Sequence, residues 1–261
     1  MPDPISSNGS SRANMADRRS VLVTRPRADA ERTAAGLAAL GLDPIVAPML
    51  EERFTGIPLP DASGFAAVAL TSANGVRALA AHPQGEAFST LRVYAVGEHT
   101  ASEARAAGFE NVSAAEGTLA DLSRAIIADR PAGKIFYPAA HHQSGDLAGL
   151  LAEAGITVDM RVLYEMHAAT MLPPGLAERL ATGKIDGAVF YSRRTAAIFA
   201  GLIASRDYQA LRRSLYCLCL SENVAQPLIE NHFLRIGLAD YPSHEAMMTL
   251  ALAFARDQIS P

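Results

Sequence analysis

The chain repeats one short pattern, in which an apolar strand ends at a hydroxyl residue or a glycine and runs directly into a helix. Residues 68–76 (VALTSANGV) correspond to residues 188–196 (AVFYSRRTA), and residues 93–101 correspond to residues 215–225. Residues 112–119 likewise correspond to residues 236–244. The spacing agrees within a few residues, since Ser72 to Gly97 is 25 residues and Ser192 to Ser221 is 29. The repeat predicts two similar α/β domains.

A fourth pair sets the expected topology. The strand and turn at residues 21–26, with the helix after them, correspond to residues 134–138 and the helix that follows. One copy opens the chain and the other closes its first half, so the first copy belongs with the C-terminal domain. We expect domains at 19–45 with 168–261 and at 46–167, with crossovers near 43–54 and 159–172, a double connection that can act as a hinge. A single sheet of unrelated strand–helix units is the alternative.

Composition agrees with this fold class. The 261-residue chain is 49% hydrophobic, enough for real cores, and its length suits one large or two ordinary domains. The strands are continuous apolar runs, as expected for a doubly wound parallel sheet covered on both faces. These runs are much shorter than the roughly 20 residues needed to cross a bilayer. We therefore expect a soluble protein that makes no membrane contact.

The N-terminal segment and the net charge indicate the cellular compartment and the class of partner. Residues 1–18 lack the apolar core of a signal peptide, so we interpret them as a disordered arm of a cytoplasmic protein. Met15 offers an alternative start, and an unstructured terminus is the simpler interpretation. The net charge is −4 and no long basic stripe occurs, which argues against a nucleic-acid partner.

Several well-known functional motifs are missing from the sequence. The turn at residues 24–29 (TRPRAD) contains no glycine, so the dinucleotide-binding fingerprint is missing from the place where it would have to lie. No P-loop, nucleophile elbow or HExxH sequence occurs. Cys217 and Cys219 lie at i and i+2 in an apolar strand, which predicts buried thiols on one side of that strand. We expect neither a cofactor nor a metal.

The remaining candidates are the strand-to-helix turns. In doubly wound sheets, ligands bind outside the carboxyl ends of the strands, where helix N-termini present free N–H groups and partial positive charge. Two domains facing each other across a hinge would form a cleft suited to a large polyanion. One wall would contain Thr71, Ser72, Gly97, Thr100 and Thr118. The other would contain Thr24, Arg25, Tyr191, Ser192, Ser221 and Ser243. The alternative is that roughly half of these residues are helix N-caps only.

In order and spacing, the motifs resemble those of uroporphyrinogen-III synthases. The resemblance runs from about Val21 to Leu252, and its motifs are Thr24-Arg25-Pro26, residues 65–76, Val96-Gly97 with Thr100-Ala101, Leu163-Tyr164-Glu165 and Tyr191-Ser192. It implies two flavodoxin-like domains joined by a two-stranded linker, with the first strand–helix unit in the C-terminal domain. It also implies a monomer.

The resemblance implies a reaction as well. A uroporphyrinogen-III synthase cyclises the linear tetrapyrrole hydroxymethylbilane with loss of water and inversion of ring D through a spiro intermediate, without a cofactor. Tyr164 matches the tyrosine proposed to help hydroxide leave, whereas the alternative is a linker aromatic used for packing. Thr100, Ser72 and Ser192 match substrate-binding positions. The expected partners are the polycarboxylate substrate and, transiently, the upstream enzyme that forms the bilane.

Some residues depart from the family pattern and keep other interpretations open. Glu222 stands where a Gly-x-Thr turn is usual in the family. Its carboxylate either repels the substrate or stabilises the N-terminus of a helix. Gln143 stands where an arginine is frequent in the family, beside His141 and His142. These histidines either supply partial positive charge in place of the arginine or are exposed loop residues without a role. A non-catalytic two-domain sensor of a tetrapyrrole or another anionic small ligand is the main alternative function. Another two-domain α/β enzyme for an anionic metabolite is the second.

Overall fold

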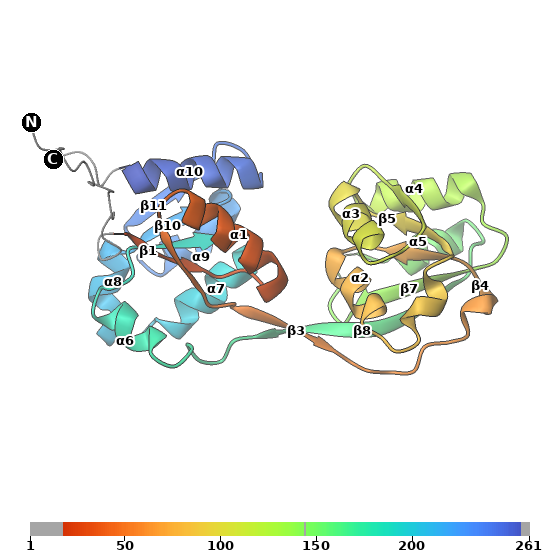
Figure 1. The fold of residues 1–261 in the computed structure, drawn as a ribbon, viewed down its shortest axis with the longest axis horizontal. Coiled ribbons are helices and arrows are strands. Elements are labelled where there is room, and N and C mark those ends of the chain that lie inside the picture. The colour runs from red at the N-terminus through yellow and green to blue at the C-terminus, as the bar shows by residue number, and fades with distance from the viewer. Residues whose placement is uncertain (1–17, 144, 257–261) are drawn as a thin grey trace, which may run out of the picture. The chain divides into compact units, whose positions relative to one another are not determined.

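The computed structural model describes residues 18–143 and 145–256 (Figure 1), so the predicted disordered arm lies almost wholly outside the described residues. The described residues divide into two compact units, the first formed by residues 18–51 and 168–256, the second by residues 52–143 and 145–167. The chain passes between the units twice, once within β3 (Leu50–Phe54) and once at the end of β8 (Val158–Ala168). Each unit is built on its own sheet.

The first unit contains a five-stranded sheet in the order β11-β10-β9-β1-β2, in which every neighbouring pair is parallel. Its strands are β1 (Ser20–Val23), β2 (Asp43–Val46), β9 (Gly187–Phe190), β10 (Tyr216–Cys219) and β11 (Arg235–Leu238). Its helices are α1 (Arg27–Ala39), α6 (Leu176–Ala181), α7 (Arg193–Leu202), α8 (Gln209–Ser214), α9 (Glu222–Glu230) and α10 (His244–Arg256), with the 3-10 turn η4 (Arg206–Tyr208). In chain order the sheet reads 2-1-3-4-5, the flavodoxin-like arrangement.

The second unit contains a six-stranded sheet in the order β3-β8-β7-β4-β5-β6. The remaining strands are β4 (Phe65–Leu70), β5 (Arg92–Ala95), β6 (Asn111–Ala114) and β7 (Lys134–Ala140). Its helices are α2 (Ala73–Ala80), α3 (Glu98–Ala106), α4 (Leu119–Asp129) and α5 (Leu147–Glu153), with the 3-10 turns η2 (Ala62–Gly64) and η3 (Gly85–Phe88). The five strands from β4 to β8 pair with one another in parallel.

The two sheets are circular permutations of one arrangement. Strands β11-β10-β9-β1-β2 take the same positions in their sheet as β6-β5-β4-β7-β8 take in theirs. The pair β1 and β2 comes first along the chain in the first unit, whereas the equivalent pair β7 and β8 comes last in the second. The expected α/β fold of two doubly wound, parallel-stranded domains is confirmed. Residues 43–46, within the segment expected to cross near 43–54, instead form β2 beside β1, and the crossing itself occurs in β3.

The strand sequences explain the layering. β1 and β9 are buried along their whole length, as continuous apolar runs in a sheet covered on both faces should be. In the first unit, one buried cluster centres on Phe190 and Phe199, and a second includes Met247 of α10. In the second unit, Phe88 and Phe136 pack with ring centroids 4.6 Å apart, while Leu122 belongs to the cluster that α4 and α5 cover. Each sheet is therefore packed with apolar side chains on both faces.

This topology locates the expected ligand edge within each unit. In the first unit the connection from β1 runs to β2 and that from β9 runs to β10, in opposite directions along the sheet. In the second unit the same reversal occurs between β4 and β7. A crevice opens outside the carboxyl ends of the strands at such a switch point, where ligands of doubly wound sheets bind. These two strand pairs therefore mark where a ligand is expected in each unit.

Candidate functional site

Tyr164 and Ser72 meet at the carboxyl edge of the second unit. Ser72 is the N-cap of α2, where its Oγ accepts a hydrogen bond from the Gly75 amide at 3.1 Å. The Tyr164 hydroxyl on β8 lies 2.7 Å from the same Oγ, although the two residues are 92 positions apart. Tyr164 is 4% exposed, and this burial raises the pKa of its phenol above the ordinary value. The phenol therefore keeps its proton at neutral pH.

Thr71 and Tyr137 form a second hydroxyl pair beside the first. The Tyr137 hydroxyl on β7 lies 3.2 Å from Thr71 Oγ1, across the switch point between β4 and β7. Tyr137 was not among the residues predicted from the sequence. Its position in the strand equivalent to residues 21–26 was the available signal, but only the pairing of β4 with β7 brings it to Thr71.

The other predicted residues of this unit lie at the next two turns. Gly97 is the N-cap of α3, and a Cβ added there would lie 3.3 Å from Gly117 Cα, so glycine allows the two turns to approach closely. Thr100 is in the first turn of α3 but is only 4% exposed, so its side chain faces the interior of the unit. Thr118 forms a reciprocal capping box with Asp121 at the start of α4. That carboxylate already occupies the positive end of α4.

In the first unit, Arg25 and Tyr191 flank the switch point between β1 and β9. The Arg25 guanidinium lies over the Tyr191 ring, 4.1 Å from its centroid, and pairs with Asp29 at 3.1 Å. The Tyr191 hydroxyl is 2.9 Å from Nδ1 of His244, the first residue of α10. Burial, followed by the charges of Arg25 and Arg32, lowers the pKa of His244. His244 was not predicted as a site residue.

Thr24 and the serines of this unit differ in how their hydroxyl groups are used. Thr24 is fully buried and its Oγ1 donates to the Val189 carbonyl at 2.8 Å, so this side chain connects β1 to β9. Ser192 accepts from the Thr195 amide at 3.2 Å, and Ser243 accepts from the Ala246 amide at 3.1 Å. Ser221 is the N-cap of α9 but makes no side-chain hydrogen bond to that helix. In the described part of the chain the Ser221 hydroxyl therefore has both its proton and its lone pairs available for a ligand.

Arg193 is a further residue that the sequence reasoning missed. It is exposed at the first position of α7, and its guanidinium contacts only the side-chain oxygen of Asn223, at 3.4 Å, among the hydrogen bonds of the described residues. Cations are disfavoured at a helix N-terminus, so this placement is unusual for a purely structural residue. The available signal was the pair of arginines directly after the Tyr191-Ser192 turn.

The residues that depart from the family pattern are exposed. Glu222 is the first residue of α9, where an acidic side chain interacts favourably with the helix dipole. Gln143 contacts the Met160 sulfur at 3.1 Å, and the rings of His141 and His142 pack edge to face. The His141 amide donates to the Tyr164 carbonyl at 3.0 Å, which ties this loop to β8.

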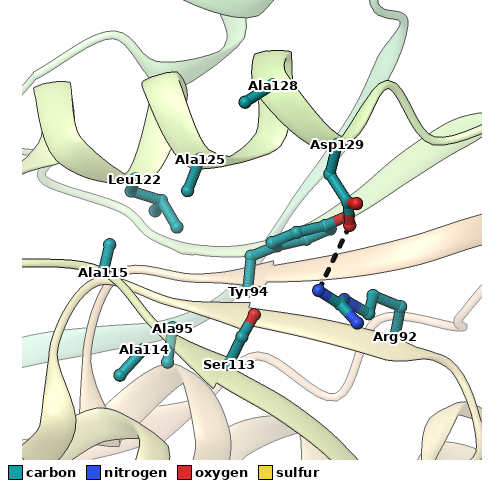
Figure 2. Close-up of a pocket in the computed structure, with 10 residues that line it drawn as sticks. All are labelled: Arg92, Tyr94, Ala95, Ser113, Ala114, Ala115, Leu122, Ala125, Ala128 and Asp129. Carbon is teal, nitrogen blue, oxygen red and sulfur yellow. Dashed lines mark hydrogen bonds and ion pairs between the residues drawn. The ribbon is translucent and has the colours of Figure 1, made fainter.

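A pocket of about 330 Å³ opens elsewhere in the second unit, between α4 and strands β5 and β6 (Figure 2). Its charged groups pair with each other: Arg92 and Asp129 form an ion pair at 3.2 Å, and the Tyr94 hydroxyl donates to Asp129. The Ser113 hydroxyl donates to the Val93 carbonyl. Burial and the hydrogen bond to Asp129 raise the pKa of Tyr94 to about 12. Alanines such as Ala125 and Ala128 form much of the wall, and none of the predicted site residues lines this pocket.

The described part of the chain contains neither a cluster of metal ligands nor a membrane-spanning helix. Within residues 18–143 and 145–256, no group of three His, Cys, Asp or Glu side chains is placed to hold a metal ion. Cys217 and Cys219 are buried free thiols whose pKa values are raised by burial, that of Cys219 to about 12. None of the helices in these ranges is both long and apolar enough to cross a membrane.

Comparison with known proteins decides the family. Residues 31–249 match the family model HEM4, described as uroporphyrinogen-III synthase HemD. The chain belongs to the uroporphyrinogen-III synthase family. It is 31% identical over 208 residues to the uroporphyrinogen-III synthase of Chlorobaculum parvum, an alignment that covers 72% of this chain and 81% of that protein.

A solved structure agrees with the fold of this family member. The uroporphyrinogen-III synthetase of Helicobacter pylori superposes with a TM-score of 0.61 at 20% identity, covering 90% of this chain and 99% of the other. At this identity the likeness establishes a shared fold. The family resemblance predicted from the residues is confirmed by the family model and the C. parvum relative.

Proposed function

We propose that this uroporphyrinogen-III synthase family member cyclises hydroxymethylbilane to uroporphyrinogen III, with loss of water and inversion of ring D through a spiro intermediate. Among the described contacts, the observation that carries the proposal is the 2.7 Å bond between the Tyr164 hydroxyl and Ser72. It places a protonated phenol at the N-terminus of α2, on the edge of a doubly wound sheet where ligands bind. Family membership supports the reaction, and we propose that this phenol takes part in it.

The substrate is a polycarboxylate, and helix N-termini are suited to its anionic groups. The amides of Ala73 and Asn74, in the first turn of α2, have no partner within that helix. They would receive one substrate carboxylate, oriented by the helix dipole and by the Thr71 hydroxyl. In the other unit, the exposed guanidinium of Arg193 and the Ser221 hydroxyl supply donors of the same kind. These local groups attract a polyanion although the net charge of the chain is −4.

Tyr164 would assist the bond-breaking step. As the hydroxymethyl C–O bond breaks, its electron pair leaves with the oxygen and a cationic pyrrole remains. The phenol either donates a hydrogen bond to the departing hydroxide or transfers its proton so that water leaves, and in the second case the phenolate regains the proton that the substrate carbon releases after ring closure. Because burial raises the Tyr164 pKa, the phenol carries the required proton throughout the neutral range. Pyrroles stabilise such cations well, so most of the catalytic effect would come from holding the chain in the geometry for inverted closure.

The proposed reaction also implies a reaction class, an oligomeric state and a compartment for the protein. The activity is that of a hydro-lyase, and the chemistry above needs only groups supplied by the chain and the substrate. We propose a monomer that works in the cytoplasm and contacts the bilane-forming enzyme only transiently. Sedimentation at working concentration, alone and with that enzyme, checks both statements about association: a stable dimer or a stable complex would contradict them.

The test is product analysis. Purified protein is incubated with freshly generated hydroxymethylbilane, and the oxidised products are separated by chromatography beside a control without protein. Spontaneous closure gives the I isomer, so enrichment of the III isomer is the expected result. Products that match the control, from protein shown to be folded by circular dichroism, would contradict the proposal and favour a non-catalytic ligand-binding protein.

A further inference from the structure

Tyr137 is a buried phenol whose hydroxyl group reaches the candidate site. The residue is 2% exposed, and its ring packs in the cluster formed by the sheet, α4 and α5, which contains Leu122 and Leu147. Because Val68 and Phe136 are partners in the pairing of β4 with β7, Tyr137 lies directly beside the end of β4. Its hydroxyl lies 3.2 Å from Thr71 Oγ1. The ring is thus fixed in the core, while its polar end lies at the carboxyl edge.

The turn between β4 and α2 is held by two phenols. Thr71 bonds to Tyr137 and the next residue, Ser72, bonds to Tyr164. Burial raises the pKa of Tyr137, as does the charge of Asp146, while the bond to Thr71 acts in the opposite direction. Tyr137 therefore remains protonated at neutral pH and is able to donate to Thr71 Oγ1. A Thr71 hydroxyl that accepts this bond has its own proton left for another acceptor.

The position of this pair matters because Thr71 is half-buried and faces the switch point. Strands β4 and β7 are the neighbours between which the connections reverse direction, so the ligand crevice of this unit opens above them. Thr71 also immediately precedes the N-cap of α2. A carboxylate at the free amides of α2 would lie within reach of the Thr71 hydroxyl.

We propose that Tyr137 is a positioning residue, which donates to Thr71 Oγ1 and so directs the Thr71 hydroxyl proton toward a substrate carboxylate at the start of α2. The proposal rests on the function proposed above. Tyr137 acts through Thr71 and contacts neither the substrate nor the reacting atoms. Its loss leaves Tyr164 and Ser72 in place, so substrate binding weakens while the bond-breaking step is preserved.

The experiment compares steady-state kinetics of the full-length protein and its variants. Tyr137→Phe removes only the hydroxyl, and we expect KM for hydroxymethylbilane to rise about 2- to 10-fold with kcat unchanged, the factor that one hydrogen bond contributes to binding. Thr71→Val should raise KM at least as much, and Thr71→Ser should restore it. The double variant Tyr137→Phe/Thr71→Val should equal Thr71→Val alone, because the phenol acts through that side chain.

Tyr94→Phe is the matched control. Tyr94 is also a buried phenol of the same core cluster, on β5, but its hydroxyl bonds to Asp129 in a pocket that contains no predicted site residue. Its removal should leave KM unchanged even if the melting temperature falls. Melting temperatures of all variants are measured to ensure that kinetics are compared below unfolding.

Several results would overturn the proposal. An unchanged KM in folded Tyr137→Phe, or in Thr71→Val, excludes positioning through Thr71, and additive effects in the double variant exclude coupling between the two residues. An equal rise of KM in Tyr94→Phe identifies a general effect of core destabilisation instead. If the unmodified protein produces no excess of the III isomer, the proposed function itself fails. If the parent protein produces the III isomer and Tyr137→Phe has unchanged kinetics, only the positioning role of Tyr137 is excluded.

Discussion

At the scale of single residues, the contact between Tyr164 and Ser72 makes the sharpest catalytic prediction. Tyr164→Phe removes the hydroxyl that lies 2.7 Å from Ser72 Oγ and keeps the buried ring. We expect kcat to fall about 100-fold, the lower end of the range for general acid–base catalysis, because the leaving hydroxyl departs readily from a pyrrole. KM should change much less, since we assign the substrate carboxylate to the first-turn amides of α2 and to Thr71, and not to the Tyr164 hydroxyl. Initial rates over a range of hydroxymethylbilane concentrations separate the two constants.

The control for this substitution is a variant of Ser72, the residue that contacts the Tyr164 hydroxyl. Ser72→Ala leaves the Tyr164 phenol intact but removes the N-cap of α2, so it should reduce stability by about 1 kcal/mol and affect kcat less than Tyr164→Phe does. Unchanged kinetics in Tyr164→Phe would remove the phenol from the mechanism and leave it as a packing residue of β8.

His244 makes a prediction about pH. Its pKa is lowered by burial and then by the nearby charges of Arg25 and Arg32, with Glu245 acting in the opposite sense. Because the folded-state pKa lies below the unfolded value of about 6.5, the unfolded chain binds this proton more readily. The stabilising contribution of neutral His244 is therefore fully present above pH 6.5 and is lost as pH falls through the folded-state pKa. His244→Gln should flatten this part of the stability profile.

Urea unfolding at a series of pH values tests this sign. The free energy of unfolding of the parent should fall below pH 6.5 more steeply than that of His244→Gln. The control variant is His232→Gln. Among the described hydrogen bonds, His232 makes none to Tyr191, whereas His244 does. A parent profile with the same slope as His244→Gln would show that this imidazole titrates equally in both states.

At the scale of secondary-structure elements, the hydroxyl residues at helix N-termini fall into two groups. Ser72, Thr118, Ser192 and Ser243 accept hydrogen bonds from amides of the helices that they begin, whereas Ser221 does not. Thr118 is the clearest cap, because its partner Asp121 completes the capping box on α4. Thr118→Ala should therefore lower the free energy of unfolding by about 1 kcal/mol. KM and kcat should be unchanged below the melting temperature.

Chemical denaturation and substrate titration of Thr118→Ala together distinguish capping from binding. Thr118→Ser retains an oxygen at the cap and should recover most of the lost stability. A raised KM in Thr118→Ala with undiminished stability would reverse the assignment and return Thr118 to the substrate-binding residues predicted from the sequence.

The elements themselves were predictable because their signals are local. An apolar run followed by a hydroxyl residue and a helical pattern is contained in about ten residues, and the turns after β4 and β9 lie where the repeat indicates. The side-chain pairs were not predictable in the same way. Thr71 and Tyr137 are 66 residues apart, and Tyr191 and His244 are 53 apart, so their contacts depend on strand order and register. The burial of Thr24 likewise follows from its bond to β9.

At the scale of the whole molecule, the repeat in the sequence corresponds to a permuted duplication. β1 and β2 begin the first unit, while their spatial equivalents β7 and β8 end the second. The correspondence between residues 21–26 and 134–138 predicted this equivalence, because both strands take the same place beside the switch point. The sequence pattern placed the first crossover near residues 43–54, and the chain leaves the first unit within β3, at residues 51–52. The pattern did not separate β2 from β3, because both are short, extended and separated by only three residues.

The division into two units leads to a prediction about local stability. Each buried cluster draws its residues from a single unit, as Ile126 of α4 and Ile203 after α7 illustrate, both with no exposed surface. Shortening either side chain to valine should cost about 0.5–1.5 kcal/mol. If each unit opens as its own cooperative element, the loss is confined to the unit that carries the substitution.

Native-state hydrogen exchange measured by mass spectrometry distinguishes the two units by their peptides. Ile126→Val should accelerate exchange of protected amides in β4, β5 and β7 by up to about tenfold and leave those of β1, β9 and β10 unchanged, since 1.4 kcal/mol corresponds to a factor of ten. Ile203→Val should give the reciprocal pattern, which makes each variant the control for the other. Equal acceleration of both sets by either substitution would mean that the chain opens as one cooperative body, and the separate clusters would then not define separate units of stability.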